Sequence, residues 1–393
     1  MNWDFLIKGK ESMQVTTDSR KVRPGSVFVA LKGEHFDGND FVEQARRDGA
    51  EYVICGENAL RDLQDLARAW RRELGLPILG ITGTNGKTTT KELCAAVLST
   101  KYKLYYTQGN LNNQIGVPLT LLSMTRAHAM AIVEMGASHP GDIKELVDIA
   151  EPNYGLITNV GKAHLQGFGS FEGVMRTKAE LYDFLRAHGG FCFRNTDNPY
   201  LAQMAGDLKT VPYTTGTMPE GTHLVGGYNA ENVSAALCVG AYFGVSEEVA
   251  LAAIRAYVPS NNRSQLMQTE RNTVIVDAYN ANPTSMQAAI EAFSNHKSEI
   301  INHKSDCYIL GAMRELGEYS HLEHQNIVNM LLERKADKVL LVGEEYKQTT
   351  APYPVFDTIE ALYAHLQQAP ISGCTILLKG SRSNQMEKIL PLL

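Results

Sequence analysis

The sequence predicts an α/β protein of three domains: a small N-terminal α/β domain, a central parallel-sheet domain with a phosphate-binding loop, and a C-terminal Rossmann-like, doubly wound domain. Two observations support this. The chain has 393 residues, which at about 150 residues per domain favours two or three domains. Apolar strand-like runs alternate with helical patterns along the chain, an order typical of parallel sheets covered by helices on both faces.

The first domain is expected over residues 1–75. Two runs rich in Val, Ile, Phe and Tyr, at 26–33 and 51–56, have strand character. The segment between them has helical spacing. A second helix over about 58–74 should end at Gly75, because glycine commonly follows the last helical residue.

The central domain is expected over residues 76–257. Near-continuous apolar runs at 78–82, 129–136 and 154–161 suit parallel strands that are buried on both faces. The stretch 229–243 has small residues on one face of a helical pattern. Strands and helices therefore alternate through this part of the chain.

The C-terminal domain is expected over residues 258–393. Helix candidates begin near Pro283, Ser320 and Thr358. They separate four strand candidates, at 273–279, 307–313, 338–343 and 375–380. This β-α-β-α-β-α-β order predicts a parallel, doubly wound sheet.

Composition excludes several classes of function. The formal net charge of −6 argues against a sequence-independent nucleic-acid binder and against an anionic membrane surface as partner. No apolar run approaches the roughly 18 residues of a membrane span, and the N-terminal residues lack the apolar core of a signal peptide. The six cysteines are scattered, which predicts free thiols in a cytoplasmic protein. Four of them are expected to be buried: Cys55, Cys94, Cys192 and Cys238.

The strongest chemical signal is the segment GITGTNGKTTT at 80–90, between a predicted strand and a helix expected from Lys87 to about Thr100. Glycines let backbone N–H groups approach phosphate oxygens, and the helix N-terminus favours an anion. Lys87 could reach the β- and γ-phosphates, and the Thr88 hydroxyl could ligate Mg²⁺. The motif is a GxxGKT variant, because Ile81 replaces the first glycine of the strict pattern. A simple connecting turn would not require the lysine and hydroxyls.

Three further residues follow strand ends or begin a helix. Glu134 lies at the end of the run 129–136, where an acid would face the ligand crevice. His164 follows the next strand, and Lys178 lies in a Lys-Ala-Glu triplet on a helix. Taken singly, they could equally be a solvated acid, a structural histidine and a solvated lysine.

The combination resembles a known family. Gly-Thr-Asn-Gly-Lys-Thr-Thr, Glu-Met-Gly, Thr-Asn-Val-Gly-x-Ala-His-Leu and Lys-x-Glu occur in the order found in the Mur ligases, ATP-dependent amide-bond-forming enzymes of peptidoglycan synthesis. The resemblance implies that Glu134 and His164 bind a second Mg²⁺ and that Lys178 is carbamylated. Ala179 stands where the family usually has glycine.

Other motifs resemble one branch of the family, which adds D-alanyl-D-alanine to UDP-MurNAc-tripeptide. They are the stretches 16–20, 28–38, 107–118, 277–286, 310–318 and 378–382. The resemblance implies ATP and Mg²⁺ as cofactors, transfer of the γ-phosphoryl group to the acceptor carboxylate, and UDP-MurNAc-tripeptide and D-Ala-D-Ala as substrates. It also makes 1–75 the UDP-substrate domain, 76–257 the ATP domain and 258–393 the ligase domain of an expected monomer.

The same resemblance implies roles for individual residues. Catalysis would depend on Lys87, Glu134, His164 and Lys178, and the metals on Thr88, Glu134, His164 and Lys178. ATP would contact Gly83, Thr84, Asn85, Gly86, Lys87, Thr88, Thr89, Asn229, Asn232, Arg263 and Asp277. The UDP-substrate would contact Ser19, Arg20, Asn110, Asn112 and Asn113.

Two departures from the family pattern stand out. Tyr228 occupies a position where histidine is common, and the segment 211–226 is shorter than the β-rich excursion usual there. The rivals are a Mur ligase that adds the third residue, folylpolyglutamate synthase, and an inactive P-loop scaffold. The sequence leaves open whether the acceptor carries meso-diaminopimelate or L-lysine at position three.

Overall fold

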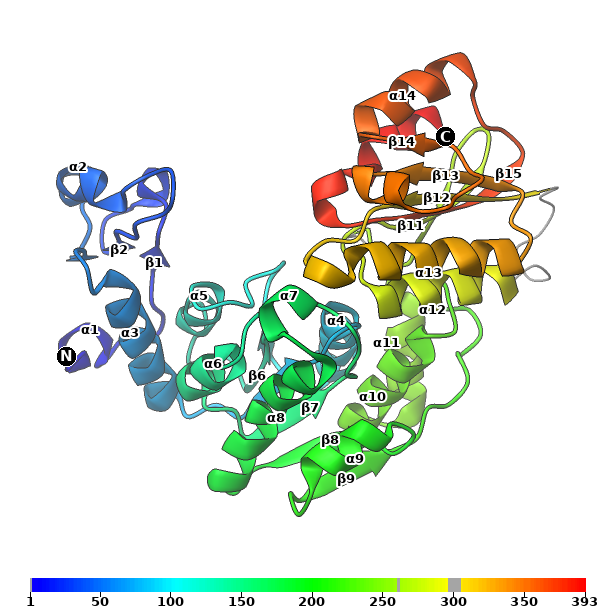
Figure 1. Ribbon diagram of the computed structural model, residues 1–393. Helices are drawn as coiled ribbons and strands as arrows, with labels where there is room; N and C mark the ends of the chain where they lie inside the picture. Colours follow the sequence, from blue (N-terminus) through cyan, green and yellow to red (C-terminus); the bar gives the residue numbers. More distant parts are fainter. Residues whose placement is uncertain (1, 260–261, 296–304) are drawn as a thin grey trace.

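The computed structural model describes residues 2–259, 262–295 and 305–393, and these residues form three sheets (Figure 1). Figure 1 shows the N-terminal unit and the C-terminal unit on opposite sides of a central unit. The α/β class predicted from the sequence is confirmed. Within the described residues, no helix is both long and apolar enough to cross a bilayer.

The N-terminal unit is a small parallel sheet in the order β1-β2-β3. Its elements are α1 (Asp4–Ile7), β1 (Val15–Thr16), β2 (Val27–Val29), α2 (Val42–Arg47), β3 (Tyr52–Ile54) and the short 3₁₀ helices Ser19–Lys21 and Gly38–Phe41. Helix α3 (Ala59–Leu74) follows and ends at Gly75, which has a φ of 62° as a left-handed helix end requires.

Helix α3 connects the N-terminal unit to the central unit. Trp70 is fully buried, and its indole N–H donates to the carbonyl of Met124 at 3.0 Å. The Arg71 guanidinium donates to the carbonyls of Ala150 and Glu151 at the end of helix α6 (Asp142–Ala150). A cation at the C-terminal end of a helix is favoured by the helix dipole, so this contact fixes α3 against α6.

The central sheet is entirely parallel, in the order β5-β6-β4-β7-β8-β9. Its strands are β4 (Ile78–Thr82), β5 (Leu104–Tyr106), β6 (Met130–Glu134), β7 (Tyr154–Ile157), β8 (Phe191–Asn195) and β9 (Thr210–Tyr213). Its helices are α4 (Lys87–Leu98), α5 (Gly116–Leu122), α6 (Asp142–Ala150), α7 (Leu165–Phe168), α8 (Phe171–Ala187), α9 (Pro199–Ala205), α10 (Asn229–Tyr242) and α11 (Glu247–Ala256).

Helices cover both faces of this sheet. Ile78 of β4 packs into a core shared with α5, α6 and α8, while Leu79 and Ile81 pack into a core shared with α4, α10 and α11. Burial on both faces explains the continuous apolar runs in the sequence. The short segment after β9 forms no strand beyond an isolated bridge between Leu224 and Gln265.

The C-terminal sheet has the order β10-β11-β15-β12-β13-β14. Its strands are β10 (Gln265–Gln268), β11 (Thr273–Asp277), β12 (Ser305–Gly311), β13 (Lys338–Val342), β14 (Val355–Phe356) and β15 (Cys374–Lys379). Helices are α12 (Pro283–Asn295), α13 (Ser320–Glu333) and α14 (Ile359–Gln368), with 3₁₀ helices at Gly317–Tyr319, Glu344–Gln348, Arg382–Asn384 and Met386–Leu392. The edge strand β10, which the sequence did not predict, runs antiparallel to β11, so the sheet is mixed.

All six cysteines are free thiols, as expected. The expected burial of four of them is only half right. Cys94 and Cys192 are buried, but Cys55 is exposed at the end of an N-terminal strand and Cys238 is only partly buried. Cys307 and Cys374 are buried in the C-terminal sheet. An apolar neighbourhood in sequence did not ensure burial for Cys55, because β3 is a short strand of a small sheet.

Candidate functional site

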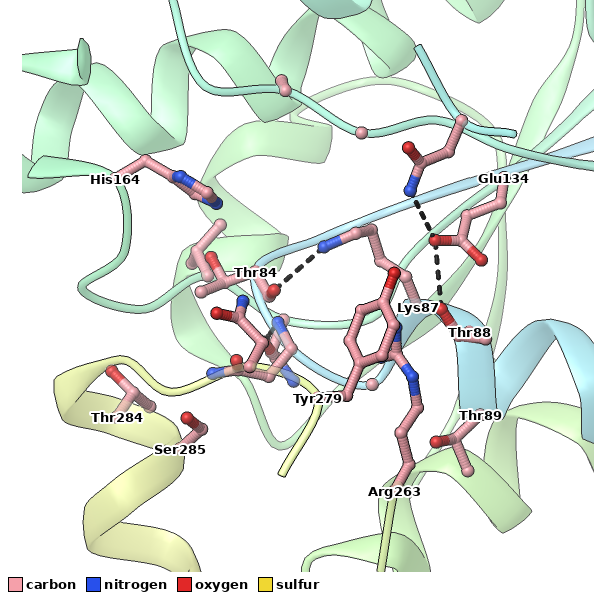
Figure 2. Close-up of a pocket in the computed structure, with 18 of the residues that line it drawn as sticks. Thr84, Lys87, Thr88, Thr89, Glu134, His164, Arg263, Tyr279, Thr284 and Ser285 are labelled. Carbon is pink, nitrogen blue, oxygen red and sulfur yellow. Dashed lines mark hydrogen bonds between the residues drawn. The ribbon is translucent and has the colours of Figure 1, made fainter. Parts of the chain in front are cut away.

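A cavity of about 770 Å³ lies where the carboxyl ends of central strands meet the C-terminal unit (Figure 2). Most of the residues that the sequence predicted to bind ATP, metal or the UDP-substrate line it. Those lining residues are Thr84, Asn85, Gly86, Lys87, Thr88, Thr89, Asn112, Asn113, Glu134, His164, Asn229, Asn232, Arg263 and Asp277. The others lie outside its lining: Ser19, Arg20, Gly83, Asn110 and Lys178.

The phosphate loop connects β4 to α4 as predicted, and two of its glycines are sterically required. A Cβ on Gly83 would stand 2.0 Å from the Thr158 hydroxyl oxygen. Gly86 has a φ of 77°, and a Cβ there would stand 2.4 Å from the side-chain oxygen of Asn232. Only glycine allows both close approaches, so the sequence pattern reflects the backbone path.

Residues at the end of β7 hold the loop in place. The Thr158 hydroxyl donates to the carbonyl of Asn85 at 2.6 Å, and the amide of Asn85 donates to the Asn159 side chain at 3.0 Å. The amide of Gly161 donates to the Thr84 hydroxyl at 3.0 Å. The Thr-Asn-Val-Gly motif thus fixes the phosphate loop before any ligand binds, which favours a preorganised anion site.

Lys87 points along its own loop. Its Nζ donates to the carbonyls of Gly83 and Thr84 at 2.8 and 3.0 Å, and Figure 2 shows the second bond. Burial lowers the pKa of Lys87 to about 8. The negative charge of Glu134 acts to raise this pKa, and the positive charge of Arg263 lowers it further. A phosphate oxygen would offer the ammonium a negatively charged partner in place of these carbonyls.

Thr88 and Glu134 form a buried oxygen cluster. The Thr88 hydroxyl and the Asn112 amide donate to Glu134 Oε1 at 3.2 and 2.9 Å. Oε2 of Glu134 has no hydrogen-bond partner, although the residue is only 1% exposed, and it lies 3.7 Å from the ammonium of Lys91. Hydroxyl and carboxylate oxygens are the ligands that Mg²⁺ prefers, so these residues fit such a cation. The described residues contain no group of three or more His, Cys, Asp or Glu side chains that could hold a metal ion. Mg²⁺ commonly completes its coordination with water and phosphate oxygens.

His164 lies across the cavity from Glu134 (Figure 2). It occupies the N-cap position of α7 with a φ of 49°, an uncommon conformation for a non-glycine residue. Its Nδ1 contacts the carboxylate of Glu315 from the C-terminal unit, and this contact lowers the pKa of Glu315. The structure therefore pairs His164 with Glu315 rather than with Glu134.

Lys178 is buried in α8 and is 2% exposed. Its Nζ lies 5.5 Å from the ring centre of Phe168. Burial lowers its pKa well below the ordinary value, and the charge of Lys87 adds to this effect, while Asp142 and Glu180 oppose it. A neutral amine is the form that reacts with CO₂, so the environment meets the chemical requirement for a carbamate.

The third residue of the Lys-Ala-Glu triplet has a structural role. Glu180 accepts hydrogen bonds from the amides of Gly141 and Lys144 at 2.9 and 2.7 Å. These amides belong to the first turn of α6, whose unpaired N–H groups favour a carboxylate. Glu180 thereby fixes α8, and with it Lys178, relative to the loop that follows Glu134.

The C-terminal side of the cavity contains an aromatic stack and an ion pair. The Arg263 guanidinium lies 3.8 Å from the ring centre of Tyr279. Asp277, at the end of β11, pairs with Lys379 at 2.5 Å and accepts a bond from the amide of Ser264 at 3.3 Å. Tyr279 and Lys379 lie within motif stretches noted in the sequence, 277–286 and 378–382, but the sequence assigned neither of them a role. Their positions at or beside the ends of β11 and β15 could have indicated one.

The two asparagines at the start of α10 are already engaged. The Asn229 amide donates to the carbonyl of Val225 at 2.8 Å, and its oxygen accepts from Asn232 at 2.9 Å. Asn232 in turn accepts from the Thr90 hydroxyl at 3.0 Å. Nearby, the hydroxyls of Tyr228 and Ser264 lie 2.6 Å apart and connect α10 to the C-terminal unit.

The residues predicted to bind the UDP-substrate are divided between two units. Arg20 is exposed on the N-terminal unit, where its guanidinium forms two hydrogen bonds with Asp18 at 2.8 and 2.9 Å. In the central unit, the Asn113 side chain accepts from the amides at the start of α5. Asn110, in the same segment as Asn113, is exposed. Ser19 directly precedes Arg20 in the N-terminal unit.

Several polar contacts cross from the central unit to the C-terminal unit, and the sequence indicated none of them as pairs. The side chain of Asn282 donates to that of Asn85 in the phosphate loop at 2.8 Å. Lys162 forms an ion pair with Glu323 at 2.9 Å. Pairs between residues more than 150 positions apart carry no local sequence signal.

Comparison with family models assigns most of the chain. The Mur ligase middle domain matches residues 81–223, and the Mur ligase glutamate ligase domain matches residues 262–382. The catalytic domain of the Mur ligase family matches residues 12–87.

Curated relatives match over nearly the whole chain. The UDP-N-acetylmuramoyl-tripeptide–D-alanyl-D-alanine ligase of Bacillus subtilis is 34% identical and covers 96% of this chain and 92% of its own length. The protein of the same name from Escherichia coli is 32% identical with the same coverage.

Solved structures agree with these relatives. The MurF ligase of Thermotoga maritima in complex with ADP aligns with a TM-score of 0.85 at 27% identity and covers 98% of both chains. MurF of Acinetobacter baumannii aligns with a TM-score of 0.84 at 28% identity, over 96% of this chain and 92% of that one.

Proposed function

The chain belongs to the Mur ligase family, and from this membership we propose that it joins D-alanyl-D-alanine to UDP-N-acetylmuramoyl-tripeptide with ATP as the energy source. The observation that carries the proposal is one cavity in which a preorganised phosphate loop, a buried Thr88–Glu134 cluster and the Arg263–Tyr279 stack converge. The relatives that match 96% of the chain at 34% and 32% identity are ligases of this specificity.

A carboxylate does not react with an amine in neutral water, so it must first be activated. The γ-phosphoryl group of ATP passes to the terminal carboxylate of the tripeptide and gives an acyl phosphate and ADP. The amine of D-Ala-D-Ala then attacks the acyl carbon, an amide bond forms, and phosphate leaves. The protein's contribution is to position the three ligands and to neutralise charge.

Individual residues supply that positioning. The amides of Gly83–Thr89 and the ammonium of Lys87 bind the phosphates, and Arg263 contacts them from the C-terminal unit. Asp277 orients the ribose, with Asn229 and Asn232 beside the adenine. Thr88 and Glu134 hold Mg²⁺, which neutralises charge on the phosphates when it is bound.

A carbamate on Lys178 and the imidazole of His164 complete the metal ligands. Burial at 2% exposure supports the assignment of Lys178, because a low pKa leaves the amine free to react with CO₂. His164 would become a metal ligand if its Nδ1 gave up the contact with Glu315. Glu315 lies on the C-terminal unit, so this exchange links metal binding to movement of that unit.

The three units divide the ligands. Residues 1–75 bind the UDP moiety through Ser19 and Arg20, residues 76–257 bind ATP, and residues 258–393 close over both. Asn110, Asn112 and Asn113 contact the rest of the UDP-substrate. The enzyme acts as a monomer in the cytoplasm, where ATP is available.

The reaction is tested by mass spectrometry of the product formed from ATP, D-Ala-D-Ala and the UDP-tripeptide with either meso-diaminopimelate or L-lysine at position three. The expected product has gained D-Ala-D-Ala, with one phosphate released per amide bond. Phosphate release only when UDP-MurNAc-dipeptide and a free amino acid replace the tripeptide and D-Ala-D-Ala would favour a third-residue ligase. No release under any of these conditions would favour a scaffold.

The role of the N-terminal unit has its own test. Replacement of Arg20 by alanine removes an exposed cation and should raise the KM for the UDP-substrate about tenfold, with the KM for ATP unchanged. Lys21→Ala is the matched control, since Lys21 is the neighbouring exposed cation. An unchanged KM for the UDP-substrate in Arg20→Ala would contradict the assignment of this arginine.

A further inference from the structure

Helix α4 carries a second lysine, Lys91, whose side chain is completely buried at 0% exposure. It lies one helical turn beyond Lys87 on the same face of the helix. Lys91 is not among the residues that line the cavity. Lysine is almost never fully buried unless its ammonium has compensating partners, so its contacts indicate what it does.

The ammonium of Lys91 is surrounded by oxygen atoms from three segments. It donates to the carbonyl of Thr107 at 2.7 Å and reaches the carbonyl of Gly109 at 3.5 Å. It pairs with Glu92 at 3.1 Å and lies 3.7 Å from Oε2 of Glu134. One cation therefore connects α4, the segment after β5 and the end of β6.

The contact with Glu134 fixes the direction of that carboxylate. Its Oε1 accepts from Thr88 and Asn112, as Figure 2 shows, whereas Oε2 has no hydrogen-bond partner. A carboxylate buried at 1% exposure requires a nearby cation. Lys91, which does not line the cavity, supplies that charge near Oε2 and leaves Oε1 to Thr88 and Asn112.

The contacts with Thr107 and Gly109 fix the loop that follows β5. Two carbonyls of this turn converge on the ammonium, directly before Asn110, Asn112 and Asn113. The Thr107 hydroxyl also accepts from the amide of Glu134 at 3.0 Å. The 107–113 loop and Glu134 are thus bonded to each other, and Lys91 contacts both of them.

We propose that Lys91 is a positioning residue that sets Glu134 and the 107–113 loop in a common geometry. The binding of the UDP-substrate and the cation dependence of nucleotide binding then both depend on a side chain that touches neither ligand. This inference rests on the proposed function, because that function assigns the loop to the UDP-substrate and Glu134 to the cation.

The test is Lys91→Met, which keeps the length of the side chain and removes its charge. Calorimetric titration of UDP-MurNAc-tripeptide without ATP should show affinity about 10- to 100-fold weaker, as expected when a supporting partner is lost. The Mg²⁺ concentration that half-maximally enhances ADP binding should rise by a similar factor. ADP binding without Mg²⁺ should not change, because the phosphate loop is held by Thr158 and Asn159.

Glu92→Gln is the matched control. It removes the carboxylate that pairs with Lys91 from the surface side and leaves the ammonium and its carbonyl partners in place. Both affinities should equal those of the wild type. The proposal is overturned if folded Lys91→Met binds both ligands normally, or if Glu92→Gln reproduces its losses.

A double variant keeps the test decisive if Lys91→Met does not fold. Lys91→Met/Glu134→Gln leaves no buried carboxylate without a cation, so it should fold, yet its affinity for the UDP-substrate should stay at least about tenfold reduced. Failure of the double variant to fold, or normal affinity, would overturn the proposal. A wild-type protein that binds no UDP-MurNAc-tripeptide would instead contradict the proposed function, and the Mg²⁺ dependence of ADP binding would still test Lys91.

Discussion

The two sides of the cavity are built differently. On the central side, the phosphate loop, Glu134 and the end of β7 are joined by hydrogen bonds within one unit, and the loop is held by Thr158 before ligands bind. On the C-terminal side, several polar groups make their bonds across the boundary. Glu315 contacts His164, Asn282 contacts Asn85, and Glu323 contacts Lys162.

This difference suggests a division of work. A network inside one unit keeps its geometry when ligands enter or leave, which suits electrostatic stabilisation by preorganised groups. Contacts across a boundary can be exchanged when the unit moves, which suits closure over bound substrates. Changes on the central side should therefore reduce the rate strongly, and changes at the boundary should act mildly and through binding.

The largest effect is expected from Lys178→Ala, which removes the amine that would carry the carbamate. An unmodified ammonium would repel Mg²⁺, whereas a carbamate attracts it, so activity should be nearly lost. Acetate should restore part of it by filling the vacated anionic site, as measured by phosphate release. Lys144→Ala, which alters an exposed lysine on α6, should retain full activity.

Retention of wild-type turnover by Lys178→Ala would contradict the carbamate role. Acetate that fails to restore any activity, in a variant whose thermal unfolding is normal, would indicate that the lysine is needed for packing. An additional mass on Lys178 in protein prepared with bicarbonate and Mg²⁺ would support the role independently of turnover.

A large effect is also expected from Lys87→Ala. It removes the charge aimed at the β- and γ-phosphates and should lower kcat at least about 10²-fold. The fold should survive, since the loop keeps its bonds to Thr158 and Asn159. Lys101→Ala, just beyond the other end of α4, serves as control because Lys101 does not line the cavity and its ammonium donates to the carbonyls of Phe243 and Gly244. Near-normal turnover in folded Lys87→Ala would remove this lysine from the mechanism.

Sequence reasoning found the central side of the cavity far better than the boundary. The strand–loop–helix around 78–98 was predicted almost to the residue, because its signals are local: glycines at tight approaches, a buried strand and a helix start. Glu134 was found from its position at a strand end together with the motif order, and Lys178 from the motif order. The contact of His164 with Glu315 could not be found, since it depends on how two units meet.

The fold shows the same limit. The central strands with long apolar runs were predicted. The edge strand β10 was missed because it has only four residues, two of them glutamine, and its Leu266 is exposed while Gln265 is partly buried. Its antiparallel direction depends on pairing with β11, which no local pattern indicates. Residues such as Lys91 also escape, because a buried lysine and a solvated helical lysine look alike in sequence.

A milder effect is expected at the boundary from Lys162→Met. It breaks the ion pair with Glu323. The carboxylate is buried, but the lysine is about half exposed and Asn326 still donates to the carboxylate at 3.2 Å, so the loss should be about 1 kcal/mol. The KM values for the substrates should rise up to about fivefold, while kcat should change little. Steady-state kinetics of Lys162→Met and of the Lys144→Met control measure this. A fall in kcat as large as that of Lys87→Ala would show that the boundary takes part in the chemical step.

The smallest effect concerns pH and the C-terminal unit alone. His324 is fully buried, accepts a hydrogen bond from the amide of Met313 at 3.0 Å and lies 2.7 Å from the carbonyl of Ser320. Burial lowers its pKa below the ordinary 6.5. Since the unfolded chain then takes up the proton more readily, this group leaves stability unchanged above about pH 6.5 and reduces it as pH falls below that value.

Thermal unfolding followed between pH 7.5 and pH 5.5 should therefore show a lower Tm at the acid end. In His324→Gln, which has an amide that can accept from Met313 but cannot be protonated in this range, the fall should be smaller, even if the Tm at pH 7.5 is reduced. Activity at pH 7.5 should remain, because Met313 precedes the boundary residue Glu315 without lining the cavity. If the Tm fell equally in the wild type and in His324→Gln, other groups would cause the acid sensitivity. His324 would then not make the C-terminal unit less stable to acid.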